Sequence, residues 1–103
     1  MKYTFKTFSN RKIELECRRI GFSYIYTTII IDGIDLYYFT KDELTSNGDM
    51  YGVIDAIVNS LTIGNIIYID KFKNVQRSIP LNSHDSKRLW KLIIEYVKSP
   101  YFI

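Results

Sequence analysis

The sequence contains very little cysteine, histidine, proline or glycine. Its 103 residues include one cysteine, Cys17, one histidine, His84, two prolines and five dispersed glycines. A lone cysteine excludes an intrachain disulfide, and one Cys with one His is too few for a structural zinc site of about four ligands. Because no Pro- and Gly-rich linker divides the chain, we predict a single domain over residues 1–103.

Long apolar runs are also absent. Runs such as Ile29 to Ile31 are far shorter than the ~18 residues that a membrane-spanning helix needs, and no basic start precedes a signal-peptide core. These absences predict a cytoplasmic protein with no membrane partner. The prevalence of Ile, Lys, Tyr and Asn, whose codons are AT-rich, indicates a phage or low-GC bacterial origin.

No catalytic constellation is recognisable in the chain. Acyl-transfer or thiol chemistry needs a Ser or Cys that a positioned base activates. Cys17 falls on the apolar face of a predicted strand, and His84 falls in the first turn of a predicted helix. Glu14 and Glu16 share a strand face with basic neighbours, as in a solvated charge ladder. With no phosphate-binding glycine loop either, we predict no catalytic residues, no metal and no cofactor.

Alternating apolar and polar side chains predict strands in the first forty residues. Period two appears in segments 2–7 and 12–18, and β-branched and aromatic residues are dense in segments 23–31 and 34–40. Ser9-Asn10 supplies turn chemistry for a first hairpin. Asp32-Gly33 is the stronger signal, because a type I′ hairpin turn needs positive φ at both central residues.

Helical patterns follow, separated by two more strand patterns. Thr40 and Glu43 fit a capping box, which predicts one helical turn, and an amphipathic helix is predicted between Asp49 and Gly64. Segments 66–72 and 75–81 have strand composition, with Pro80 at a strand end or a sheet edge. Ser83 is the predicted cap of a final helix, whose apolar stripe contains Leu89, Trp90, Ile93, Ile94 and Val97.

These elements predict an α+β fold. We expect one antiparallel sheet of about six strands, in the order ββββ-α-ββ-α, with the two amphipathic helices packed on one face. The net charge of +3 is mild and has no tail or block of like charge, so it permits contact with nucleic acid without requiring it.

Aromatic residues are abundant, at 16% of the chain, and Tyr is favoured at binding surfaces. Three consecutive aromatic side chains on one strand must cover both of its faces, so the face away from the helices should present at least one ring. We therefore predict a non-enzymatic protein-binding module, such as a small inhibitor of immunity or phage anti-defence type that acts by steric occlusion. A homodimer through the same face is the other partner that this surface would fit. The predicted contact residues are Tyr24, Tyr26, Tyr37, Tyr38 and Phe39.

A nucleic-acid-binding domain is the alternative interpretation. Basic side chains on the first two strands and on the final helix lie among aromatic residues, as in sheets that contact phosphates and stack bases. Glu14 and Glu16 weaken this patch. A small hydrolase or nuclease whose site the sequence does not reveal ranks third. The predicted nucleic-acid contacts are Lys2, Lys6, Lys12, Arg18, Lys87, Arg88 and Lys91.

Overall fold

The chain adopts an α+β fold in which an antiparallel sheet packs against helices. The structure is a computed structural model, which describes residues 2–6, 11–21, 24–46, 48–64, 67–70, 75–77 and 80–99. In chain order the elements are β1 (Lys2–Lys6), β2 (Lys12–Ile20), β3 (Tyr24–Ile31), β4 (Ile34–Phe39), α1 (Lys41–Thr45), α2 (Met50–Thr62), β5 (Ile67–Asp70), β6 (Val75–Arg77) and α3 (Ser83–Lys98).

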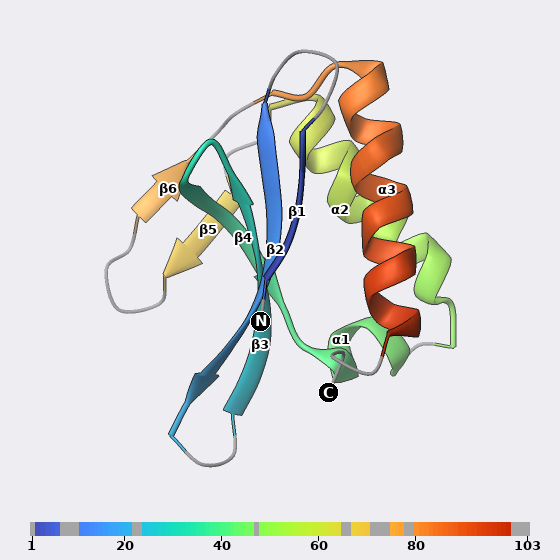
Figure 1. Cartoon of the computed structure of the whole chain (residues 1–103). Helices are drawn as coiled ribbons and strands as arrows, with labels where there is room; N and C mark the ends of the chain where they lie inside the picture. The colour runs from blue at the N-terminus through green and yellow to red at the C-terminus, as the bar shows by residue number, and fades with distance from the viewer. Residues whose placement is uncertain are drawn as a thin grey trace.

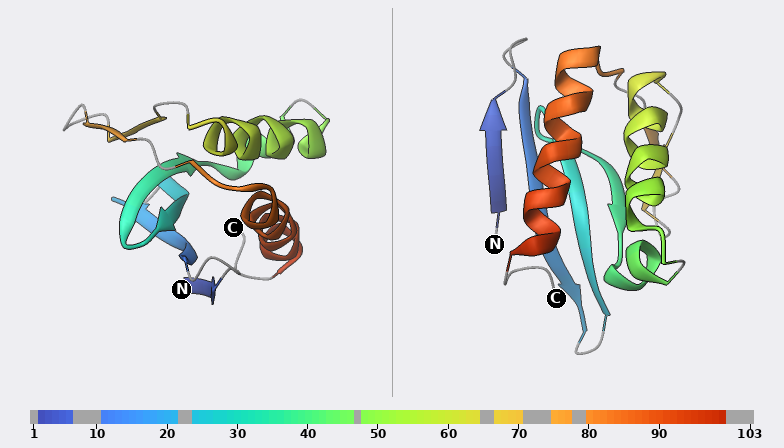
Figure 2. Two further views of the ribbon diagram at one scale, coloured as in Figure 1. Left: turned by 90° about the horizontal axis from the view of Figure 1, so that it is seen from above. Right: turned by 90° about the vertical axis from the view of Figure 1, so that its right-hand side faces the viewer.

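The helices lie on one side of the main sheet. Strands β1 to β4 are antiparallel neighbours in sequence order, so β2 and β3 are central. Figure 1 shows α2 and α3 to one side of this sheet and the β5–β6 pair on the other side, next to β4. In Figure 2, α2 and α3 run side by side in front of the strands, and α1 lies at one end of α2.

The predicted single sheet of about six strands is wrong. The main sheet has four strands, and the side chains that it contributes to the described core come from three of them, β2, β3 and β4. Strands β5 and β6 pair with each other and contact β4 without joining the sheet. The helical turn predicted after Thr40 is present as the short helix α1. A strand pattern indicates extended backbone but does not say which strand it will pair with, so the division into two sheets was not visible in the sequence.

The hairpin between β3 and β4 has the predicted turn. Asp32 has φ 53° and Gly33 has φ 78°, so both central residues are in the left-handed region that a type I′ turn requires. The turn is also tied to β2, because the backbone N–H of Asp32 donates to the carbonyl of Lys12 at 2.8 Å and the Lys12 N–H donates to the Asp32 carboxylate at 3.1 Å. The local prediction is confirmed.

Replacing Gly33 with valine should lower the free energy of unfolding by at least ~1 kcal/mol, because a side chain at positive φ is strained. A Cβ at this position would meet no atom within 4 Å, so backbone strain alone should cause the loss. Gly33→Asn is the control, since Asn tolerates the left-handed region, and it should lose much less. Urea denaturation of the two variants measures the difference, and a loss below ~0.5 kcal/mol for valine would contradict the turn assignment.

Local side-chain caps begin the helices. The side chains of Thr40 at α1 and Asp49 at α2 each accept a hydrogen bond from a backbone N–H three residues later. At α3 the cap is Asn82 rather than the predicted Ser83: its side-chain oxygen accepts from the Asp85 N–H at 2.8 Å. Such caps satisfy the orphan donors of a first turn, which explains why the helices begin where they do.

The hydrophobic core fills the space between the sheet and the helices. It is formed by the inward side chains of β2, β3 and β4 and by the buried stripes of the three helices. A β-bulge in β4 leaves Leu36 without a partner opposite it on β3, and this residue is fully buried. The buried stripe of α3 contains Leu89, Leu92, Ile93 and Tyr96, whereas the predicted members Trp90, Ile94 and Val97 pack at its border.

Candidate functional site

The aromatic residues that the sequence predicted as partner contacts do not form one surface. Phe39 is 1% exposed and belongs to the core. Tyr37 is half-buried at a groove of about 180 Å³ between β4 and α2. Tyr26 and Tyr38 are also half-buried, and their rings meet edge to face at 5.6 Å on the side of the sheet away from α3. The side chain of Tyr24 lies outside the described residues.

Tyr37 is a neutral group in a largely apolar setting. It shares its groove with Val53, Ala56, Ile57 and Ser60 of α2. Burial raises the pKa of the Tyr37 phenol, and the charge of the Glu43 carboxylate raises it further. The phenol of Tyr37 therefore stays protonated at neutral pH.

The face of the sheet away from α3 carries a network of ion pairs. Arg18 donates two hydrogen bonds to Asp35, at 2.6 and 3.1 Å, and two more to Glu16, at 3.0 and 3.2 Å. The hydrogen bond to Asp35 raises the pKa of the Arg18 guanidinium, against an opposing effect of burial, and Glu16 adds to the increase. This arrangement links β2 to β4 across β3 and holds the sheet in register.

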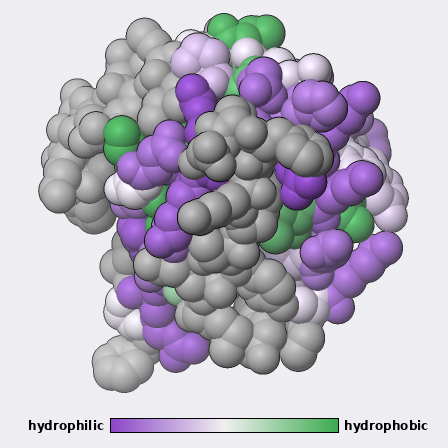
Figure 3. Space-filling model, turned by 45° about the horizontal axis from the view of Figure 1, so that its top comes forward, coloured by the Kyte–Doolittle hydropathy of each residue, from purple (hydrophilic) through white to green (hydrophobic). Residues whose placement is uncertain are grey.

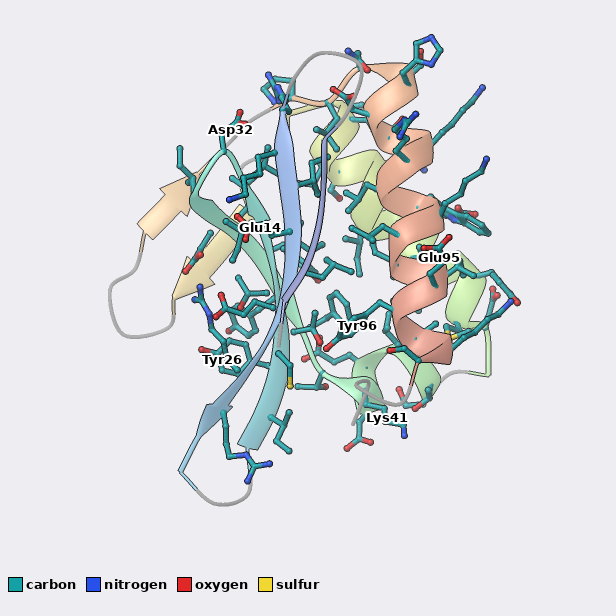
Figure 4. All side chains as sticks on the ribbon, viewed as in Figure 1. Glu14, Tyr26, Asp32, Lys41, Glu95 and Tyr96 are labelled. Atoms are coloured by element: carbon teal, nitrogen blue, oxygen red, sulfur yellow. The ribbon has the colours of Figure 1, made fainter. Side chains whose placement is uncertain are left out.

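Glu14 differs from its predicted role as a solvated charge. It is 4% exposed on the same face, with the Lys12 ammonium 3.6 Å from its carboxylate. Figure 4 shows Glu14 and Tyr26 on the side of the sheet opposite α3, while Tyr96 points from α3 toward the strands. The carboxylates of this face are engaged by neighbouring cations, which favours a structural role over acid and base work.

The predicted nucleic-acid contacts separate into two groups. Lys12 and Arg18 on β2 form the ion pairs just described, so their charges are compensated within the chain. The basic residues of α3 are exposed: Lys87, Arg88 and Lys91. The side chains of Lys2 and Lys6 lie outside the described residues. The structure therefore does not bring the strand and helix groups together into one basic patch within its described part.

An aromatic pair that the sequence did not indicate bridges the two longer helices. The rings of Tyr51 on α2 and Trp90 on α3 are stacked, with centroids 6.0 Å apart and planes 22° apart. The Trp90 indole N–H donates to the Asp55 carboxylate at 2.6 Å. Tyr51 is 50% exposed, and Ile63 is the other exposed large hydrophobic residue in the described part of the chain. Ile63 is the C-cap at the opposite end of α2.

We call the solvent-facing side of α2 and α3 around this pair the outer helix surface. Its centre is aromatic, and the half-buried Ile94 lies one turn beyond Trp90 on α3. Its rim is basic on the α3 side. Figure 3 shows that hydrophilic side chains gather over the helix side of the molecule. The members of the surface are Tyr51, Asp55, Trp90 and Ile94, with the exposed lysines Lys87, Lys91 and Lys98.

The residues considered for catalysis lie on different elements. Cys17 is half-buried on β2, and His84 is exposed in the first turn of α3. In the described ranges, no group of three or more His, Cys, Asp or Glu side chains is placed to hold a metal ion. None of the helices in the described part of the chain is both long and apolar enough to cross a membrane.

Comparison of the chain with protein-family models, curated proteins and solved structures finds no match. The outer helix surface is therefore interpreted from its own geometry and chemistry.

Proposed function

We propose that the protein is a non-enzymatic protein-binding module that acts by covering a surface of its partner, as a small inhibitor of a larger enzyme does. The observation that carries this proposal is the half-exposed ring of Tyr51, stacked on Trp90 at the outer helix surface. Tyr and Trp dominate the residues whose truncation most weakens protein interfaces.

The geometry of the pair supports a binding role because the rings are held in place before a partner arrives. Trp90 is fixed on one side by its hydrogen bond to Asp55 and on the other by the stacked Tyr51 ring. A side chain that is already ordered loses little rotamer freedom on binding, so more of the contact energy remains as affinity. The surrounding polar and charged residues would form the rim that such a centre usually has.

Binding of nucleic acid remains the second candidate, and the exposed basic residues of α3 favour it. Two observations favour a protein instead. Lys12 and Arg18 are engaged by carboxylates, which removes the strand half of the proposed basic patch. The carboxylate of Asp55 also lies at the aromatic centre, where it would repel a phosphate backbone.

Tyr51→Ala should weaken partner binding at least about 30-fold, the effect of losing ~2 kcal/mol at an interface hot spot. Its free energy of unfolding should change by no more than about 1 kcal/mol, because the ring is half-exposed and loses one stacking contact. The partner is first identified by cross-linking in lysate, then purified for titration. Trp90 is the chain's single tryptophan, so its fluorescence reports binding at this surface directly.

Ile63→Ala is the matched control, because it removes an exposed large hydrophobic side chain from the end of the same helix. Its affinity for the partner should stay within about threefold of wild type, as expected for a residue outside a hot spot. Equal affinities for Tyr51→Ala and wild type would place the interface elsewhere. Salt-dependent binding to generic DNA or RNA that Tyr51→Ala abolishes would support the nucleic-acid alternative instead.

A further inference from the structure

We infer that the outer helix surface recognises an acidic protein segment, whose carboxylates lie over the lysines of α3 while an apolar or aromatic side chain packs on the Tyr51 ring. This inference rests on the proposed function and names the chemistry of the partner. The inference adds the charged side chains around the Tyr51–Trp90 pair to the aromatic contact itself.

The lysines of α3 share one side of the helix. Lys87 and Lys91 are one turn apart, and Lys98 follows two turns later, so the three extend over roughly 16 Å of helix. Trp90 and Ile94 lie beside this row on the side toward α2. An acidic segment that runs along the row would therefore place neighbouring side chains over the aromatic centre.

These lysines form no close ion pair in the part of the chain that the structure describes. No carboxylate there lies within 4.0 Å of the ammonium group of Lys87, Lys91 or Lys98. The cations of β2 behave differently, since Lys12 and Arg18 both have carboxylate neighbours. The sheet compensates these cations within the chain, whereas none of the described carboxylates forms an ion pair within 4.0 Å with the α3 lysines.

The row of lysines on α3 lowers the stability of the helix. Like charges at i and i+4, such as Lys87 and Lys91, repel each other on a helix surface. Glu95 follows Lys91 by four residues and precedes Lys98 by three, so its exposed carboxylate offsets part of this repulsion, whereas Asp85 is 1% exposed in the first turn. A partner that brings carboxylates to the row would reduce the repulsion that remains, so binding it would be favoured by charge complementarity.

A protein segment fits the surface better than a polyanion of uniform charge. The Asp55 carboxylate lies beside Trp90, Glu95 lies between Lys91 and Lys98 on α3, and Tyr51 supplies a half-exposed ring for an apolar contact. A segment of mixed residues can place its carboxylates over the lysines and leave uncharged residues opposite Asp55. A phosphate backbone has a charge at every step and cannot do so.

The test is a selection of random 12-residue peptides displayed on phage. Peptides are selected on the wild-type protein and depleted on Tyr51→Ala, so those that remain depend on the aromatic centre. We expect them to be enriched in Asp and Glu around an aromatic or large aliphatic residue. One such peptide is then synthesised, and its Kd is measured from Trp90 fluorescence over a range of NaCl concentrations.

The double variant Lys87→Glu/Lys91→Glu should raise the Kd of this peptide at least about tenfold and flatten its dependence on salt. The control is Arg19→Glu/Lys41→Glu, which makes the same change in net charge at two exposed positions on β2 and α1. Its Kd should stay within about threefold of wild type. Lys87→Gln/Lys91→Gln, which adds no negative charge to the helix, repeats the test if circular dichroism shows that the Glu variant is unfolded.

The outcomes separate this inference from the proposed function. If Tyr51-dependent peptides are neutral or basic, an acidic partner is excluded, and the outer helix surface is still supported as a protein-binding surface. If no Tyr51-dependent peptide is recovered, both fail. If a 20-nucleotide single-stranded or duplex DNA binds with the same dependence on Tyr51 and more tightly than the peptides, the occupant is nucleic acid and the inference is overturned.

Discussion

Replacing Phe39 with alanine should lower the free energy of unfolding by about 3–5 kcal/mol, the range for removing a buried Phe ring. Phe39 is 1% exposed at the end of β4 and contacts the core cluster between the sheet and the helices. Truncation loses the transfer free energy of the ring and leaves a cavity that the neighbouring side chains cannot fill. Because a domain is stable by only ~5–15 kcal/mol, much of the stability would disappear.

Tyr38→Ala is the control for this prediction. Tyr38 is adjacent in sequence but half-buried, and its described ring contact is the edge-to-face pair with Tyr26 on the other face of the sheet. It should lose clearly less stability than Phe39→Ala in guanidinium denaturation. If Phe39→Ala instead weakened partner binding and left the unfolding midpoint unchanged, Phe39 would belong to an interface, as the sequence had predicted, and its assignment to the core would be wrong.

Tyr96→Ala should be similarly destabilising, by about 3–5 kcal/mol. The side chain is 1% exposed on α3, and its ring reaches the sheet, where the Thr27 hydroxyl donates to its phenol oxygen at 3.1 Å. The contact joins the final helix to the central strand β3. Removing it should therefore weaken the packing of α3 on the sheet as well as leave a cavity, and denaturant unfolding measures the combined loss.

Two milder variants separate the cavity from the hydrogen bond. Tyr96→Phe keeps the ring and should lose only ~1 kcal/mol, the net value of a typical buried hydrogen bond. Combining it with Thr27→Val removes both partners, so the double variant should be more stable than the sum of the two single losses implies. A loss of less than ~1 kcal/mol for Tyr96→Ala would show that α3 is not anchored to the sheet at this point.

Several local features were predictable because they depend on residues that are close in sequence. The Asp32-Gly33 turn follows from the φ values that the two residues tolerate, and both are positive in the structure. The α1 cap at Thr40 and the limits of α2, between Asp49 and Gly64, follow from capping and from helical spacing. Each of these signals acts over a few residues and needs no knowledge of the rest of the fold.

The candidate site was less predictable. Lys87 and Lys91 were predicted contacts only in the nucleic-acid alternative, Trp90 was predicted in the apolar stripe of the final helix, and Tyr51 had no predicted role. The two rings are 39 positions apart in the chain, and they stack because α2 and α3 lie side by side. Helical spacing alone does not show whether a residue such as Trp90 lies in the centre of the apolar stripe or at its border. A border residue can face the core, a neighbouring helix or solvent.

The amino-acid sequence alone determined the Asp32-Gly33 turn and the caps of α1 and α2, since backbone preferences and side-chain hydrogen bonds act locally. The tertiary structure decided that β5 and β6 form a separate pair and that Phe39 is buried while Tyr51 is half-exposed. It also decided that Arg18 is engaged by Asp35 while the α3 lysines have no described carboxylate within 4.0 Å. Burial and charge compensation depend on which elements pack together, and residues distant in sequence control that packing.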